Sequence, residues 1–104
     1  MSKLPFDPAL LKENASNVAD LLGGMANARR LEILCHLSKE KEATVNALAE
    51  AVGLSASATS QHLTKMREEG LVAFRKERQT VWYRIGDPRI EQLLRTLQRL
   101  FCLS

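Results

Sequence analysis

Residues 44–67, TVNALAEAVGLSASATSQHLTKMR, predict two short helices joined by a tight turn. Apolar side chains recur at helical spacing in the first half of the stretch. Gly53 follows them where a helix ends in a left-handed residue, a conformation that glycine adopts at little cost. Ser55 then stands where a side-chain oxygen caps the next helix. This is the helix-turn-helix arrangement, whose second helix reads base edges in the major groove of DNA.

The second helix has one apolar side and one polar side. Thr59, Leu63 and Met66 follow one another at helical spacing and are expected to be buried. The opposite face has no carboxylate before Glu68, so it suits a groove lined by phosphates. A packed helical hairpin with a solvated, serine-rich face is the alternative interpretation. The residues predicted to face DNA are Ser57, Ser60, Gln61, Thr64 and Lys65.

A charged hairpin follows the second helix, which is expected to end at Gly70. The segments Leu71–Arg75 and Thr80–Ile85 are rich in β-branched and aromatic residues and predict two strands, joined by the tip Lys76-Glu77-Arg78-Gln79. A hairpin directly after a recognition helix is the order of a winged helix, whose wing contacts the DNA backbone or the minor groove. An ordinary solvated hairpin is the alternative. The wing residues predicted to bind DNA are Arg75, Lys76 and Arg78.

The length of 104 residues predicts one domain, and the order of the elements makes it a single winged-helix DNA-binding domain over residues 1–104. Hydrophobic residues make up 45% and charged residues 26%, which predicts a globular rather than a disordered chain. The net charge of +3 is a modest basic excess, so the position of the charges matters. No apolar run approaches the roughly 18–20 residues that span a bilayer, and the N-terminal residues lack the apolar segment of a secretory signal. We therefore expect a cytoplasmic protein with no membrane partner.

Further helices are predicted on both sides of this module. Asp7-Pro8 opens a first helix that is expected to end or bend at Gly23-Gly24. A second helix covers about 27–39. Asp87-Pro88 opens the last helix, which has a broad apolar stripe. The predicted fold is mainly α with a β-hairpin, in the order α-α-α-α-β-β-α.

The two terminal helices are expected to form a dimer interface. A domain of 104 residues has little interior left for the apolar stripes of both helices. Pairing with a second copy would bury them and would present two recognition helices to successive major grooves, about 34 Å apart. We therefore predict a homodimer on double-stranded DNA with a near-palindromic operator. Arg29 and Arg30 of the second helix are expected to be solvated.

Four segments resemble the ArsR/SmtB family of bacterial dimeric winged-helix repressors: MANARRL (25–31), LAEAVGL (48–54), SATSQHLTKMREEGL (57–71) and YRI (83–85). The resemblance spans about residues 19–102. It implies dimerisation through the first and last helices, release from operator DNA on binding an inducer, and the DNA-facing residues named above. Many relatives carry Gln where this chain has Ala56. His62 lies one residue past the DNA face and is interpreted as a half-buried packing or hydrogen-bonding residue.

The known metal-sensing patterns of this family are absent. Arsenic- and cadmium-sensing members carry a Cys-x-Cys pair, which this chain lacks. Zinc-sensing members carry histidine on the last helix, where this chain has Asp87 and Glu91 but no histidine. His36 and His62 lie on other helices at no ligand spacing. Metal sensing therefore has little support, and neither a metal site nor a cofactor is predicted.

Cys35 and Cys102 resemble, in their positions, the cysteine pair of the sulfide- and persulfide-responsive, BigR/SqrR-like subgroup. The stretch LSASATSQHL (54–63) is also similar to that subgroup. The resemblance implies thiol-based sensing of sulfide, persulfide or oxidants, in which a thiolate attacks and the partner thiol closes a disulfide or polysulfide link. The alternatives are two buried core cysteines, and a metal-responsive or cysteine-independent repressor of the same type.

Enzyme motifs are missing from the sequence. There is no GxSxG, P-loop or HExxH pattern. Cys35 and His36 are neighbours on a helix and point about 100° apart, which makes a poor catalytic dyad. We therefore predict a dimeric, sequence-specific DNA-binding transcriptional repressor that is not an enzyme. A winged-helix module for protein–protein interaction is the remaining alternative.

Overall fold

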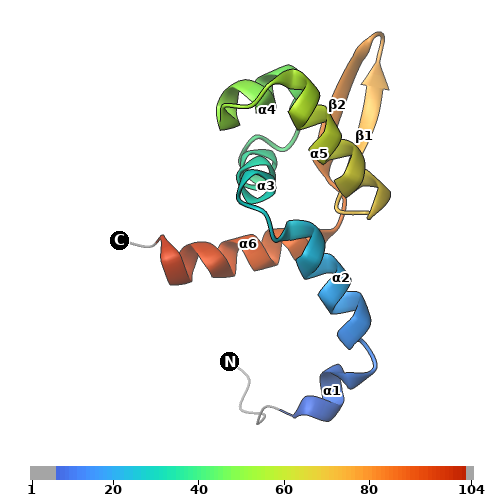
Figure 1. Cartoon of the computed structure of the whole chain (residues 1–104), viewed down its shortest axis with the longest axis vertical. Helices are drawn as coiled ribbons and strands as arrows, with labels where there is room; N and C mark the ends of the chain where they lie inside the picture. The colour runs from blue at the N-terminus through green and yellow to red at the C-terminus, as the bar shows by residue number, and fades with distance from the viewer. Residues whose placement is uncertain (1–6, 103–104) are drawn as a thin grey trace.

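The computed structural model describes residues 7–102, which form six helices and one two-stranded hairpin. In chain order these are α1 (Pro8–Lys12), α2 (Ala15–Met25), α3 (Ala28–Glu40), α4 (Val45–Val52), α5 (Ala56–Glu68), β1 (Val72–Glu77), β2 (Thr80–Ile85) and α6 (Pro88–Phe101). Helices α1 and α2 form an arm that projects from the body, while α4, α5 and the hairpin lie at the other end of the molecule (Figure 1). None of these helices is both long and apolar enough to cross a membrane.

The turn between α4 and α5 is fixed by local contacts that the sequence predicted. Ser55 Oγ accepts a hydrogen bond from the backbone N–H of Ala58 at 3.0 Å, and this contact starts α5. Gly53 ends α4 at φ 73°, in the left-handed region. The predicted helix-turn-helix is therefore confirmed. Side-chain caps are also made by Asp7 and Asp87, as predicted, and by Asn27 and Thr44.

The predicted first helix is divided into two. Helix α1 ends at Lys12, residues 13–14 form a turn, and α2 begins at the next residue. The side chain of Asn14 makes no cap, and α1 buries no residue that would hold it in line with α2. Gly23-Gly24 do not end the helix, because α2 continues to Met25. The observed order is therefore α-α-α-α-α-β-β-α, and the rest of the predicted winged-helix fold is confirmed.

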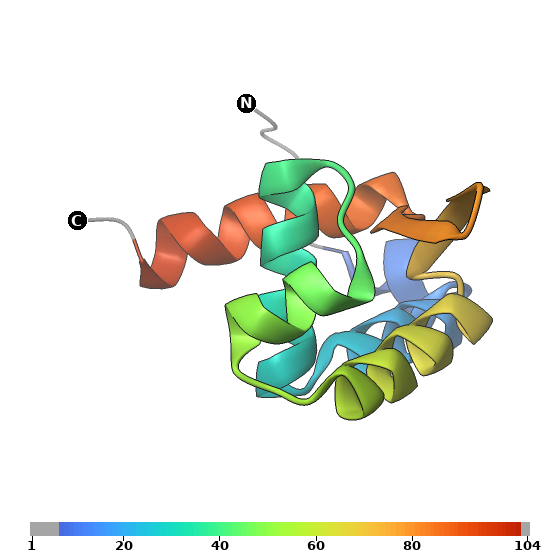
Figure 2. The same cartoon turned by 90° about the horizontal axis from the view of Figure 1, so that it is seen from above.

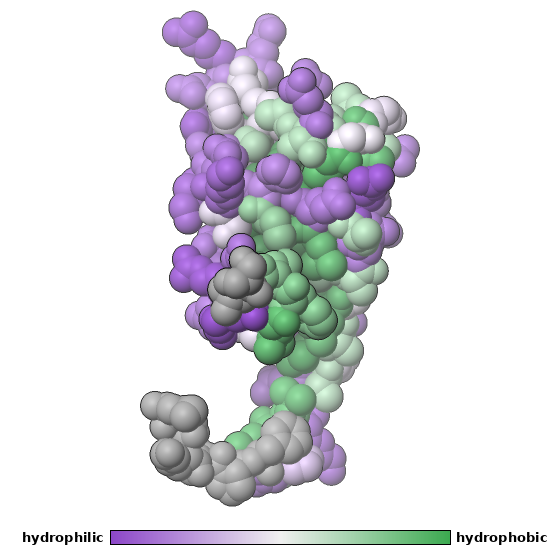
Figure 3. Space-filling model, turned by 90° about the vertical axis from the view of Figure 1, so that its left-hand side faces the viewer, coloured by the Kyte–Doolittle hydropathy of each residue, from purple (hydrophilic) through white to green (hydrophobic). Residues whose placement is uncertain are grey.

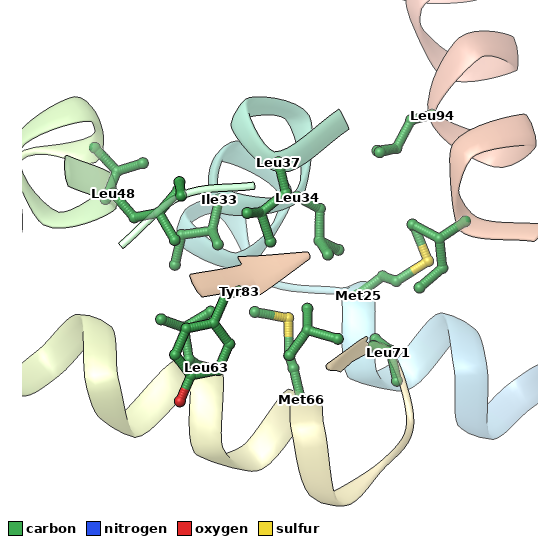
Figure 4. Close-up of a cluster of buried hydrophobic side chains, with 14 residues drawn as sticks. Met25, Ile33, Leu34, Leu37, Leu48, Leu63, Met66, Leu71, Tyr83 and Leu94 are labelled. Carbon is green, nitrogen blue, oxygen red and sulfur yellow. The ribbon is translucent and has the colours of Figure 1, made fainter. Parts of the chain in front are cut away.

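One hydrophobic core holds α5 in place. Leu63 and Met66 of α5 are 0% exposed and point toward Ile33 and Leu34 of α3 (Figure 4). Thr59 is also 0% exposed, so the three residues predicted to form the buried side of α5 do so. Burial of each large side chain contributes about 1.5–3 kcal/mol. The largest fully buried apolar side chains are Ile33, Leu34, Leu37, Leu48, Leu63, Met66, Leu71 and Ile90.

The hairpin stands beside the C-terminal end of α5 (Figure 2). Its strands are antiparallel, with Val72 opposite Ile85, and only residues 78–79 remain in the turn. Strand β1 therefore begins one residue later and ends two residues later than predicted, whereas β2 has the predicted bounds. Ala43 exchanges two backbone hydrogen bonds with Tyr83, at 3.0 and 2.8 Å. These bonds attach the base of the hairpin to the connection between α3 and α4.

Two adjacent glycines of α2 offer a matched test of the packing. A Cβ at Gly23 meets nothing within 4 Å, so Gly23→Ala should stabilise the protein by up to about 1 kcal/mol through helix propensity. A Cβ at Gly24 lies 2.7 Å from Glu69 Oε1 and 3.0 Å from Leu71 Cδ2. Glu69 can turn away, but Leu71 is buried. We therefore expect Gly24→Ala to be less stable than Gly23→Ala by about 1–3 kcal/mol.

Chemical denaturation at one fixed protein concentration measures both free energies of unfolding. Equal stabilisation by the two alanines would contradict the close packing of α2 against the α5–β1 connection.

Candidate nucleic-acid interface

The polar face of α5 is accessible along the helix. Ser57, Gln61 and Lys65 are exposed, and Ser60 and Thr64 are half-buried. Their spacing places these five predicted DNA-facing residues in one stripe, opposite the side that enters the core. A helix of 13 residues is about 20 Å long and fits a major groove about 12 Å wide. The structure therefore brings the α5 part of the predicted interface together, on a helix held rigidly from behind.

The wing has fewer free cations than the sequence suggested. Arg75 donates hydrogen bonds to both carboxylate oxygens of Glu42, at 2.8 and 3.0 Å, and another to Glu77 at 3.3 Å. The hydrogen bond with Glu42 raises the pKa of Arg75 and lowers the pKa of Glu42. Lys76 and Arg78 are exposed at the tip and form no ion pair within residues 7–102. Together with Arg84 of β2, which is also exposed and in no ion pair among these residues, they are the wing cations available to phosphates.

His62 connects α5 to α3. The residue is half-buried, and its Nδ1 accepts a hydrogen bond from Arg30 Nε at 3.1 Å, which confirms the expected hydrogen-bonding role. Burial and the charge of Arg30 lower the pKa of His62. The Arg30 side chain is only 17% exposed, so the expectation that it is solvated is wrong. Its partner His62 lies 32 residues further along the chain, and no local pattern in the sequence points to this pair.

Cys35 of α3 and Cys102, at the end of α6, line one groove between these two helices. The groove has a volume of about 790 Å³, and Leu31 and Phe101 form part of its apolar wall. Both cysteines are exposed and free, so the interpretation as buried core residues is wrong. Desolvation of the thiol against this wall raises the pKa of Cys35, and the negative charges of Cys102 and Glu32 raise it further.

Metal ligands do not converge in the part of the chain that the structure describes. Within residues 7–102, no group of three or more His, Cys, Asp or Glu side chains is placed to hold a metal ion. His36 lies beside the thiol groove, whereas His62 is hydrogen-bonded to Arg30. The two histidines therefore belong to different surfaces and cannot form one ligand set.

A buried helical support, a polar stripe on α5 and a hairpin beside it define a winged helix-turn-helix DNA-binding domain. The family model described as "Bacterial regulatory protein, arsR family" matches residues 27–73, from the cap of α3 into β1. The transcriptional activator HlyU of Vibrio cholerae is 41% identical over 98 residues, which span 94% of this chain and 90% of HlyU. The chain therefore belongs to the ArsR family of bacterial regulatory proteins.

Solved structures of relatives have the same fold. The structure of reduced HlyU from Vibrio cholerae aligns with a TM-score of 0.81 and 42% identity, covering 89% of this chain and 97% of that one. The transcriptional repressor BigR from Xylella fastidiosa aligns with a TM-score of 0.87 and 29% identity, covering 95% of this chain and all of BigR. A homodimeric winged helix-turn-helix DNA-binding domain from Mycobacterium bovis aligns with a TM-score of 0.74 and 31% identity, covering 96% of this chain and 89% of that one.

These relatives confirm the predicted class of protein. The chain is a DNA-binding transcriptional regulator and not an enzyme. The predicted resemblance to the ArsR family is confirmed at the level of the family. Sequence identity is 41% with HlyU and 32% with the biofilm growth-associated repressor of Xylella fastidiosa. The identities therefore do not support the narrower assignment to the BigR-like subgroup.

The wing offers a test of DNA contact whose control leaves the net charge of the protein unchanged. Arg78→Ala should lower the affinity for duplex DNA and reduce the slope of log K against log[salt] by about 1 per chain, because one phosphate contact is lost. The control removes a whole ion pair, Glu42→Ala with Arg75→Ala, and should leave the slope unchanged. Fluorescence anisotropy titrations at several salt concentrations measure both slopes. A full unit lost in the double variant would show that Arg75, not only the tip, binds phosphate.

Proposed function

We propose that the protein is a homodimeric, sequence-specific repressor that leaves its operator when Cys35 and Cys102 react with a persulfide or another thiol oxidant. The observation that carries this proposal is that both thiols, on helices far apart in the sequence, line the same groove. A metal-responsive mechanism has no comparable support within residues 7–102. The proposed setting is the cytoplasm, where operator DNA lies.

The thiol chemistry balances without a cofactor. A thiolate attacks the outer sulfur of an organic persulfide, RSSH, the S–S bond breaks, and RS⁻ leaves and takes up a proton. The modified cysteine is now a persulfide. The second thiolate attacks its inner sulfur, expels HS⁻ and forms a disulfide, so that two thiols are oxidised and one sulfur atom is reduced to sulfide. Both cysteines are exposed, and because the raised pKa of Cys35 keeps more of this residue as the thiol, we assign the second attack to Cys35.

A link between the two cysteines would join α3 to α6. Helix α3 packs against α4 and supports α5 through Ile33 and Leu34, whereas α6 carries Phe101, which is 80% exposed, and Leu100, which is 70% exposed. The link therefore bears on both the reading helix and the proposed dimer interface. It weakens DNA binding if the linked form fits the DNA-bound geometry less well than the reduced form.

The names of two relatives support parts of this proposal. BigR of Xylella fastidiosa is named a transcriptional repressor, and one HlyU structure is described as reduced. HlyU is also named a transcriptional activator. An operator–reporter assay with and without the regulator distinguishes the two directions, and lower expression with the reduced regulator is the proposed outcome.

Exposed apolar side chains support the homodimer. Leu100 and Phe101 of α6 are 70% and 80% exposed, and Leu10 of α1 is 71% exposed. The face in Figure 3, seen from the C-terminal end of α6, is hydrophobic through its centre and along the arm, while hydrophilic residues gather above. A second copy placed across this surface would cover it. Two recognition helices related by a two-fold axis would require a near-palindromic operator.

The cysteine pair is tested by operator binding before and after treatment with an organic persulfide. The reduced protein should bind, and the treated protein should bind at least about tenfold more weakly, with mass spectra showing one added sulfur atom or the loss of two hydrogens. Cys35→Ser and Cys102→Ser should each bind normally and lose the response. Parallel treatments use glutathione disulfide and zinc. Release by zinc alone, or an unchanged response in either serine variant, would overturn the proposed pair.

The dimer is tested with charge placed on two sides of α6. Phe101→Glu puts a carboxylate on the apolar surface, and we expect light scattering to report a monomer and operator affinity to fall by about 100-fold, because the second half-site contact is lost. Gln92→Glu adds the same charge nine positions earlier, about 180° around the helix, and serves as the control. A Phe101→Glu protein that remained dimeric would rule out this surface as the interface.

A further inference from the structure

Arg30, in the first turn of α3, connects its own helix to α2 and to the recognition helix α5. Its Nε donates a hydrogen bond to His62 Nδ1 of α5 at 3.1 Å, and its NH1 donates to the carbonyl oxygen of Gly24 in α2 at 3.2 Å. The same NH1 lies 4.0 Å from Glu69 Oε1, just past the end of α5. The guanidinium of Arg30 therefore holds the recognition helix α5 against α3. It also contacts α2, which is part of the arm proposed to form the dimer interface.

The donor identifies the protonation state of its partner. A guanidinium carries only donors and keeps its charge at any physiological pH. His62 Nδ1 must therefore be unprotonated to accept from Arg30, and the single ring proton lies on Nε2. Burial and the charge of Arg30 lower the pKa of His62, so the neutral ring is the stable form at neutral pH. The contact between α3 and α5 thus depends on a neutral imidazole.

We propose that Arg30 is a positioning residue for DNA binding, which fixes α5 to α3 and to the end of α2 through its contacts with neutral His62 and with Gly24. We call this set of contacts the lock. Protonation of His62 breaks the contact with Arg30, opens the lock and weakens operator binding. The proposal concerns the scaffold behind the recognition helix rather than a contact with DNA. It does not require the thiol chemistry, because neither cysteine contacts Arg30 or His62 through a hydrogen bond.

Protonation converts an attractive contact into a repulsive one. With a proton on Nδ1, two donors and two positive charges would face each other at the present 3.1 Å, in a site that is partly removed from water. The charged groups around the ring are Arg30 from α3, Lys65 one turn further along α5, and Glu69 beside Arg30. No carboxylate within residues 7–102 forms an ion pair with His62. Nothing described in the structure therefore stabilises the imidazolium in place.

The sign of the pH effect separates positioning from simple electrostatics. An added positive charge on a recognition helix should increase affinity for phosphates as the pH falls. Opening of the lock predicts the reverse, a loss of affinity. The lowered pKa of His62 puts the loss below the ordinary histidine value of 6.5. Well above that value the neutral ring predominates, and affinity should be flat.

The experiment measures operator affinity from about pH 7.5 to about pH 5.5 at constant ionic strength, the range that spans the ordinary histidine titration. We expect the reduced wild-type dimer to lose about tenfold in affinity over this range, the equivalent of one charge-assisted hydrogen bond. His62→Asn keeps an acceptor near the position of Nδ1 but cannot be protonated, so its affinity should change less than twofold. His36→Asn, at the other histidine, should retain the wild-type loss.

Two further measurements keep the test independent of any one variant. Nitrogen chemical shifts of the His62 ring in the wild-type protein should show an unprotonated Nδ1 at pH 7.5. Arg30→Lys keeps the positive charge but removes the guanidinium, which donates to His62 and Gly24 at the same time. This variant should bind the operator more weakly at pH 7.5, while circular dichroism shows the wild-type helix content. A wild-type affinity that rises or stays flat on acidification, an equal loss in His62→Asn, or a protonated Nδ1 at pH 7.5 would overturn the proposal.

Discussion

The direction in which α5 faces depends on complete burial of its opposite side. Thr59, Leu63 and Met66 are all 0% exposed, so the helix cannot rotate without drawing apolar surface into water. A serine- and threonine-rich helix of 13 residues is not stable alone, and this packing supplies its stability. Within the described residues Thr59 Oγ1 has no hydrogen-bond partner, which costs about 1–3 kcal/mol and shows that apolar packing outweighs polar satisfaction here.

Features encoded by neighbouring residues could be predicted from the sequence, and features made by distant residues could not. The cap at Ser55, the left-handed Gly53 and the buried side of α5 depend on residues within two turns of one another, and all three were predicted. Arg75 meets Glu42 across 33 residues, and Arg30 meets His62 across 32. Hydropathy periodicity contains no information on such pairs, so the partners of Arg30, which was expected to be solvated, and of Arg75, which was predicted to bind DNA, were both missed.

The break between α1 and α2 has a similar origin. The periodicity of apolar residues predicted one helix that continued past Asn14. The position where a helix ends depends, however, on how much apolar surface the flanking turns bury. Helix α1 buries nothing in a single chain, and Leu10 and Leu11 are exposed. The same reasoning applies to the last turns of α6, where Leu100 and Phe101 are exposed. A domain of this size cannot cover the apolar faces of both α1 and α6, and the proposed second copy would cover them.

Helix α3 is the element through which both proposed inputs would act. Arg30 and Cys35 are five residues apart, which places them about 140° apart around the helix and about 7.5 Å apart along it. One side of α3 therefore holds the reading helix through His62, while another side forms the wall of the thiol groove with α6. Because the core between α3 and α5 is close-packed, α3 cannot shift toward α6 without disturbing Ile33, Leu34 or the Arg30 contact. Sulfur chemistry in the groove and protonation of His62 would thus alter the same interface from opposite sides, and their effects on DNA affinity should not be additive.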